Sequence, residues 1–338
     1  MRFPRPSAQD YQRSKKDPDR PPVFRDADFA MRFAQGRWSE DRLIEGVNRM
    51  ANFRALPYGR SEVGPEPRDK IRDYWRRYVA AEPHGKRPDV LVVRAEDYEW
   101  ALRVAGNDPT TASDEVLAPV VGRAVCGIEA ENSLWVAKEM RDFATTVPLT
   151  RKDPKSPNIW VKDQDAPGLR VWMYHHQKPV VVVQVFYDAA YAMALHDILR
   201  LAKRVEGAPA AQREAKGKEL GLFVKVQSYI DSRTGVATRK KVFVVHHSIA
   251  TPFGDLQGKV STDAKVIFGK NGKIMPYVHF SGGRLQITGE GERLLERIAA
   301  LSEFREAVGP PGQGACLSRP LRALAAAAVS ARGRGAQP

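Results

Sequence analysis

Apolar residues form short continuous runs along the first two thirds of the chain. Runs rich in β-branched residues predict strands at 89–94, 124–130 and 180–186, and a further strand is expected at 169–174. Within Val180–Phe186 only Gln184 is polar, which is typical of a strand covered on both faces. These runs therefore predict a sheet with a buried centre.

Apolar residues three and four positions apart predict the intervening helices. Leu43, Ile44, Val47 and Met50 follow this spacing, and Ser39 precedes them as a candidate cap. The same spacing predicts helices over 39–53, 67–81, 96–105, 133–143 and 188–205, followed by a linker over 208–217. The order of elements predicts the α/β (α+β mixed) class, with a central mixed sheet flanked by helices.

After residue 220 the pattern changes to closely spaced strands. Strands are predicted at 221–230, 240–248, 264–268, 274–280 and 284–288, with a hairpin turn at 270–273 and a helix at 290–303. The chain is thus expected to have four parts: an N-terminal basic arm or disordered segment (1–24), a core (25–206), a β-rich C-terminal extension (218–305) and a disordered basic tail (309–338).

Charge favours a polyanionic partner. The 54 basic and 40 acidic residues give a net charge of +14, and nucleic acid is the first candidate partner, although basic tails can also simply improve solubility. Cys126 and Cys316 do not make a disulfide framework or a zinc site. No apolar run approaches the roughly 20 residues that span a bilayer, and no secretory signal is recognisable, so we expect a cytoplasmic protein without a membrane partner.

Two carboxylates lie close together in the strand predicted at 124–130. Glu129 and Glu131 are two positions apart, so both side chains point to one face of a strand, and Asp89 begins an earlier strand. Acids that share a face need compensation, and a divalent cation supplies it while activating water. The alternatives are that the pair is the solvated face of an edge strand and that Asp89 only makes a turn contact.

On these residues the chain resembles the PD-(D/E)xK nuclease superfamily, and within it the type II restriction endonucleases. The matching pieces are Pro88-Asp89, the segment Gly127–Trp135 and the strand and helix that begin at Pro179; together they cover about 88–205. The resemblance implies a restriction-endonuclease-like sheet, catalytic Asp89, Glu129 and Glu131, and Mg²⁺ bound by Asp89 and Glu129. Glu131 stands where the superfamily usually has Lys.

Glu131 is then either a general base or a ligand of a second metal ion. Lys138 is a candidate substitute for the missing cation. Gln184 either touches the site or bridges backbone groups.

A site-specific nuclease must also read bases, through side chains that reach the DNA grooves. Candidate DNA contacts gather in two polar segments: Lys155, Asn158, Lys162 and Gln164 in the first, and Arg239, Lys240 and Lys241 in the second. A palindromic target in double-stranded DNA calls for a homodimer. The pairs His175-His176 and His246-His247, taken as strand residues, point to opposite faces and do not chelate a metal together.

The leading hypothesis is therefore a Mg²⁺-dependent endonuclease that cuts double-stranded DNA at a short specific sequence. A sequence-specific DNA-binding protein without catalysis, and a repair or transposition nuclease of the same superfamily, are the alternatives.

Overall fold

The computed structural model describes residues 3–14, 27–59, 84–106, 109–144, 155–230, 237–268 and 274–308. The chain divides into two units, Met1–Ser302 and Glu303–Pro338, and the described residues of the second belong to the end of helix α9 (Gly289–Val308). Several predicted features lie outside the described residues: residues 15–24 of the arm, the helix over 67–81, the turn over 270–273 and the tail from 309.

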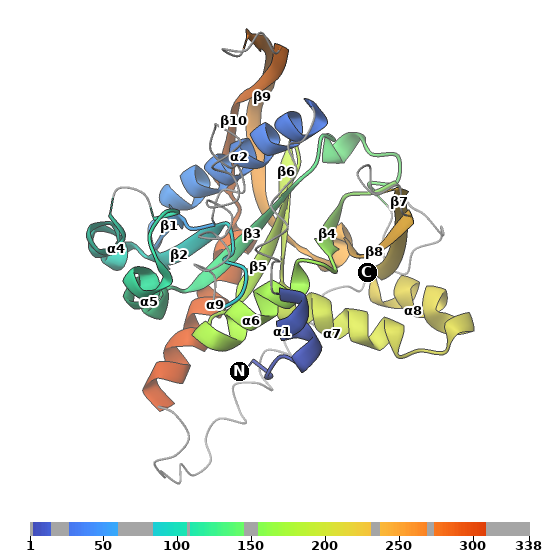
Figure 1. Ribbon diagram of the computed structural model, residues 1–338, viewed down its shortest axis with the longest axis horizontal. Coiled ribbons are helices and arrows are strands. Elements are labelled where there is room, and N and C mark those ends of the chain that lie inside the picture. The colour runs from blue at the N-terminus through green and yellow to red at the C-terminus, as the bar shows by residue number, and fades with distance from the viewer. Residues whose placement is uncertain are drawn as a thin grey trace, which may run out of the picture. The chain divides into compact units, whose positions relative to one another are not determined.

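The first unit contains a seven-stranded sheet in the order β1-β2-β3-β5-β6-β9-β10 (Figure 1). Every neighbouring pair is antiparallel except β3 and β5, which are parallel. The mixed sheet predicted from the sequence is therefore confirmed. Its strands are β1 (Phe53–Pro57), β2 (Val90–Arg94), β3 (Cys126–Asn132), β5 (Val180–Val185), β6 (Ala189–Ala194), β9 (Thr251–Phe268) and β10 (Ile274–Ile287).

Helices cover both faces of this sheet, as the sequence predicted (Figure 1). On one face, α2 (Ala27–Asn48) and α9 contribute Leu43 and Leu295 to a core that contains Val181 and Val183. On the other face, Trp172 packs in a core with residues of four helices, which are α4 (Tyr98–Ala105), α5 (Asp114–Arg123), α6 (Ala166–His176) and α7 (Leu195–Glu206). β5 is buried at every position, which agrees with its apolar sequence.

A second, three-stranded sheet has the order β4-β8-β7, with β4 (Asn158–Lys162), β8 (Ala237–His246) and β7 (Leu222–Ile230). The strands after residue 220 are therefore shared between two sheets, because β9 and β10 extend the large one. The division into a core (25–206) and a β-rich C-terminal extension (218–305) stays a prediction. No helix in the described part of the chain is long and apolar enough to cross a membrane.

Three predicted elements are wrong because tertiary contacts override local pattern. Residues 169–174 were predicted as a strand but belong to α6, which is buried on most sides, so its apolar residues show no helical stripe. Residues 189–194 were predicted as helix, yet they form β6 because they pair with both β5 and β9. The helix predicted over 133–143 is reduced to the single turn η3 (Ala137–Glu139), where Asp188 accepts hydrogen bonds from the amides of Ala137 and Lys138.

Other boundaries moved for similar reasons. The helix predicted over 39–53 ends at Asn48, whose side chain bonds the backbone of Ala55 in β1. The predicted linker contains the turn η4 (Ala210–Gln212) and the first part of helix α8 (Arg213–Leu220). Turns η2 (Ala95–Asp97) and η5 (His247–Ile249) precede α4 and β9. Within the predicted arm, α1 (Ala8–Ser14) packs against α6, and Asp10 pairs with Arg170 at 2.9 Å.

Candidate functional site

Two neighbouring strands bring Asp89 and Glu129 together. Strands β2 and β3 are antiparallel, with Val90 opposite Ile128. Continuing that register places Asp89 opposite Glu129, and Oδ2 of Asp89 accepts a hydrogen bond of 2.8 Å from the amide of Ala130. The residue before β2 is thus fixed against the middle of β3, although 40 positions separate it from Glu129 in the sequence.

The backbone around this pair leaves no room for a side chain at Gly127. A Cβ atom there would come within 2.9 Å of Cβ of Pro88 and closer still to its Cγ. Pro88 therefore packs directly on β3, and the carbonyl of Asp89 accepts two bonds of 2.9 Å, from the amides of Tyr58 and Gly59. These contacts orient the Asp89 side chain toward β3.

Glu129 is not part of a solvated edge, because β3 lies between β2 and β5 and the residue is 5% exposed. Glu131 points to the same face and is half-buried. In the parallel register Glu131 lies beside Gln184, which is also buried. Oε1 of Gln184 accepts from the amide of Trp160 at 3.2 Å, so Gln184 bridges to the backbone of β4.

Strand β4 also brings a cation to the site. The ammonium of Lys162 lies 3.5 Å from both carboxylate oxygens of Glu131. Lys162 was predicted as a DNA contact, and the structure places it in contact with an acid of the candidate site.

The second cation, Lys86, comes from the turn before β2. Its ammonium contacts Oε1 of Glu129, and its amide donates to the carbonyl of Gly168 at 3.1 Å. A Cβ on Gly168 would lie 2.8 Å from Cβ of Lys86, so the first turn of α6 packs tightly on this lysine. Lys86 thus brings a positive charge to β3 from another segment of the chain.

Two further acids belong to the same electrostatic cluster. Burial is the largest cause of the raised pKa values of Asp89 and Glu40; Glu40, on α2, adds to that of Asp89, and Glu129 adds to that of Glu40. Asp165, which directly precedes α6, raises the pKa values of Lys86 and Glu129. We define the acid cluster as Glu40, Asp89, Glu129, Glu131 and Asp165.

Burial is the main cause of the raised carboxyl pKa values in the acid cluster. It lifts the pKa of Glu129 to about 8, with Asp89 adding to the effect and Lys86 opposing it. Burial likewise raises the pKa values of Asp89, Glu131 and Glu40 to about 7. Several carboxyl groups therefore titrate near neutral pH, and the cluster attracts cations when it ionises.

The lysines respond in the opposite sense. Burial alone would lower the pKa of Lys86, but Glu129, Asp165 and Asp89 together outweigh it, and this pKa lies well above its usual value. Glu131 is the main cause of the raised pKa of Lys162. Both side chains therefore stay charged.

The donor chemistry fits a hard divalent cation. Within the described residues, Oε2 of Glu129 is a buried carboxylate oxygen without a hydrogen-bond partner, and Asp89 stands opposite it. No group of three or more His, Cys, Asp or Glu side chains in this part of the chain is arranged to hold a metal ion by itself. Mg²⁺ does not need such a cage, because it keeps several waters and takes one or two carboxylates together with substrate phosphate oxygens.

The other predicted residues are not members of the acid cluster as defined above. Lys138 is exposed in η3, and its amide donates to Asp188 at 3.1 Å. The two predicted DNA-contact segments lie side by side, because β4 pairs with β8 and Lys162 stands opposite Val242. Their remaining members are exposed or half-buried: Lys155, Asn158, Gln164, Arg239, Lys240 and Lys241. Lys241 is paired with Glu206 at 2.6 Å.

The first histidine pair differs from the sequence expectation, whereas His246 ends strand β8 and His247 begins η5. His175 and His176 end helix α6 rather than lying on a strand, and the ring of His175 stacks on His84 with centroids 3.4 Å apart. Burial lowers the pKa of His176 to about 3 and that of His246 to about 4. These rings are therefore neutral at physiological pH.

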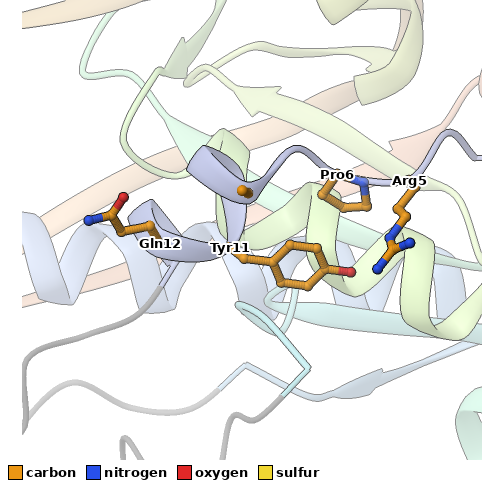
Figure 2. Close-up of a pocket in the computed structure, with 5 residues that line it drawn as sticks. Arg5, Pro6, Tyr11 and Gln12 are labelled. Atoms are coloured by element: carbon orange, nitrogen blue, oxygen red, sulfur yellow. The ribbon is translucent and has the colours of Figure 1, made fainter.

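A pocket of about 530 Å³ lies elsewhere, on the N-terminal segment (Figure 2). Its lining residues are Arg5, Pro6, Ala8, Tyr11 and Gln12. None of them belongs to the acid cluster, so this pocket is separate from the candidate site.

Sequence reasoning missed Lys86, Glu40 and Asp165. Lys86 lies three residues before Asp89 in a segment that reads as a turn, and Glu40 lies on a helix about 50 residues before it. Neither is at a spacing that connects it with the acid pair. The one signal was the position of Lys86 just before an acid-bearing strand. This position alone does not indicate a contact with Glu129, because the contact depends on how α6 packs against Lys86.

Comparison with known proteins adds one similarity. Residues 7–146 match the family model of the AccI restriction endonuclease, which is less than half of the chain. The matched range includes every acid of the cluster except Asp165, and also Lys86. The match supports a type II restriction endonuclease, that is, a nuclease that binds DNA. No curated protein and no solved structure matches the chain.

Proposed function

We propose that this protein is a Mg²⁺-dependent type II restriction endonuclease that hydrolyses double-stranded DNA at a short, palindromic sequence. The observation that carries the proposal is the placement of Asp89 opposite the buried Glu129 on adjacent strands, beside Glu131 and two lysines. The similarity of residues 7–146 to a restriction endonuclease family supports it independently. The site is then a PD-(D/E)xK arrangement in which Glu131 replaces the lysine.

In this proposal Asp89 and Glu129 hold Mg²⁺. When bound, the ion supplies a lowered pKa for a coordinated water and neutralises charge on the phosphate. The chain's own residues do the remaining work. Lys86 balances the charge of Glu129 and fixes the orientation of its carboxylate, because the ammonium touches one oxygen and leaves the other available.

Glu131 is the proposed general base. Its pKa of about 7, raised by burial and opposed by Lys162, is suited to accepting a proton near neutral pH. Lys162 holds both of its oxygens at 3.5 Å and so limits their orientation. Glu40, on α2, interacts electrostatically with Asp89 and adds negative charge that strengthens cation binding.

The test is digestion of a long double-stranded DNA of known sequence with the full chain in MgCl₂ and in EDTA. We expect a fixed set of fragments that appears only with Mg²⁺. Glu129→Gln is expected to lower the rate at least about 100-fold, because it removes a buried charged group from the site. Glu139→Gln, the same change at an exposed position on η3, is the matched control.

Each contrary outcome has a distinct meaning. Full cleavage by Glu129→Gln contradicts the assignment of the site. Smears or single nicks, in place of discrete fragments, favour a repair or transposition nuclease. Specific binding without hydrolysis by the unaltered chain favours a non-catalytic DNA-binding protein. A two-fold symmetric target requires a homodimer. Sedimentation of the chain bound to a duplex that carries the mapped target measures the number of chains per duplex and so tests this requirement.

A further inference from the structure

The loop that follows β3 exposes two large apolar side chains. Leu134 is 49% exposed and Trp135 is 65% exposed, which makes Trp135 the most exposed large apolar residue in the described part of the chain. Single exposed apolar residues are ordinary on protein surfaces, but a tryptophan is rarely left so open. The position of this pair calls for a physical reason.

The loop is held firmly in place. The amide of Ser133 donates to Val185 at 2.9 Å, and the carbonyl of Trp135 accepts from Tyr187 at 3.1 Å. Beyond the loop, Asp188 accepts from the amides of Ala137 and Lys138 at 2.5 and 3.1 Å. Bonds on both sides thus fix the backbone, so Trp135 is presented to solvent by a rigid segment.

The loop also lies next to the acid cluster. Trp135 follows Glu131 by four residues, so their Cα atoms are at most about 14 Å apart. Anything bound with a phosphate at Glu129 and Glu131 therefore has its neighbouring nucleotides within reach of this loop.

We propose that Trp135, together with Leu134, is a DNA contact that presses on the base step beside the scissile phosphate and partly unstacks it. This inference rests on the proposed function, since it takes double-stranded DNA as the substrate. Aromatic side chains stack on bases of any sequence, and apolar side chains wedge between base steps. A rigid wedge there holds the phosphate against the acids.

A second protein copy fits the loop less well. A stable interface buries about 800 Å² on each partner, whereas one tryptophan contributes at most about 250 Å². The next exposed residues along the chain are the charged Lys138 and Glu139, which follow the apolar pair within four positions of Trp135. The patch is therefore of a size that suits one base step rather than a subunit interface.

The experiment uses a duplex that carries the mapped cleavage sequence with 2-aminopurine next to the cut. Binding is measured in the cleavage-deficient Glu129→Gln chain with and without Trp135→Ala, and cleavage in the otherwise unaltered chain. We expect Trp135→Ala to weaken binding about 10-fold and to abolish the rise in 2-aminopurine fluorescence that marks unstacking. Trp135→Phe should retain part of both.

Val226→Ala is the matched control, because Val226 is 60% exposed on β7, outside this loop. The proposal is overturned if Trp135→Ala binds the duplex as tightly as Val226→Ala does and gives the same rise in 2-aminopurine fluorescence. It is also overturned if Trp135→Ala converts a dimer to monomers, which assigns the patch to a subunit interface. If the unaltered chain cleaves DNA in either case, the proposed function stands and only this inference fails.

Discussion

The ammonium of Lys86 lies against Oε1 of Glu129, on the strand that carries both acids of the i, i+2 pair. This lysine comes from the turn before β2, whereas position 131 holds a second acid. A cation thus meets the buried carboxylates although strand β3 itself supplies none. A positive charge therefore lies beside Glu129, and the segment before β2 provides it.

Replacing Lys86 should therefore impair DNA cleavage without preventing folding. We expect Lys86→Ala to lower the cleavage rate about 100-fold, with partial recovery in Lys86→Arg. Because Lys86 lowers the pKa values of Glu129 and Asp89, its loss should move the rise in cleavage rate to higher pH. The measurement is the pH profile of single-turnover cleavage.

Lys203→Ala is the control for Lys86, since Lys203 is an exposed lysine on α7, outside the candidate site. It should leave the rate and the pH profile nearly unchanged. Equal losses in the two variants, or a Lys86→Ala profile with an unshifted midpoint, would show that Lys86 has no electrostatic role in the site.

The sequence indicated part of this site and could not indicate the rest. Asp89, Glu129 and Glu131 were predicted as candidate site residues because strand periodicity places the acid pair on one face and because consecutive strands usually lie beside each other in a sheet. Lys86 and Glu40 were not found, since their proximity depends on how α6 and α2 pack on the sheet. Such contacts are set by tertiary packing and leave no spacing pattern.

Stability should depend on pH through the acid cluster. The carboxyl pKa values rise from about 4.5 when solvated to about 7 for Glu131 and about 8 for Glu129 in the folded chain. At a pH between the solvated and the folded pKa values, the folded state binds more protons than the unfolded state. The free energy of unfolding therefore falls as pH rises from about 5 to 8. Below pH 4.5 the stabilisation that comes from the raised carboxyl pKa values is fully present.

Chemical unfolding in EDTA at several pH values tests this expectation. A single group of this kind changes the free energy of unfolding by at most about 1.4 kcal/mol per pH unit. Glu129→Gln should make the free energy of unfolding fall less steeply with pH, because it removes the carboxyl group whose pKa is about 8. Glu139→Gln should leave the slope unchanged. A stability that stays constant or increases over this range would contradict the charge assignment.

Addition of Mg²⁺ should reverse the decline. A ligand that binds only the folded state stabilises it by about 1.4 kcal/mol at ten times its dissociation constant. The effect on the melting temperature should be larger at pH 8 than at pH 6, since protonated carboxyl groups bind the ion poorly. Asp89→Asn and Glu129→Gln should both remove the shift, and its persistence in these variants would place the ion elsewhere.

The fold was predictable where local pattern and tertiary environment agree. The run at Val180–Val185 became the fully buried β5, and Leu43 and Val47 became the core face of α2. Prediction failed at Ala189–Ala194, because alanine favours helix while the gap between β5 and β9 requires a strand. It failed at α6 because burial on most sides removes the amphipathic stripe.

Gly127 links the fold to the site, because its missing side chain lets Pro88 pack on β3 and so positions Asp89. Gly127→Ala should lower the free energy of unfolding by about 2 kcal/mol, through overpacking against the rigid proline ring, and should also reduce cleavage in the folded fraction. Gly122→Ala is the control, since nothing lies within 4 Å of a Cβ there and an exposed helical glycine gains up to about 1 kcal/mol on replacement. Urea unfolding of both variants measures the difference. Equal stabilities would mean that Pro88 can move aside freely and that Gly127 does not position Asp89.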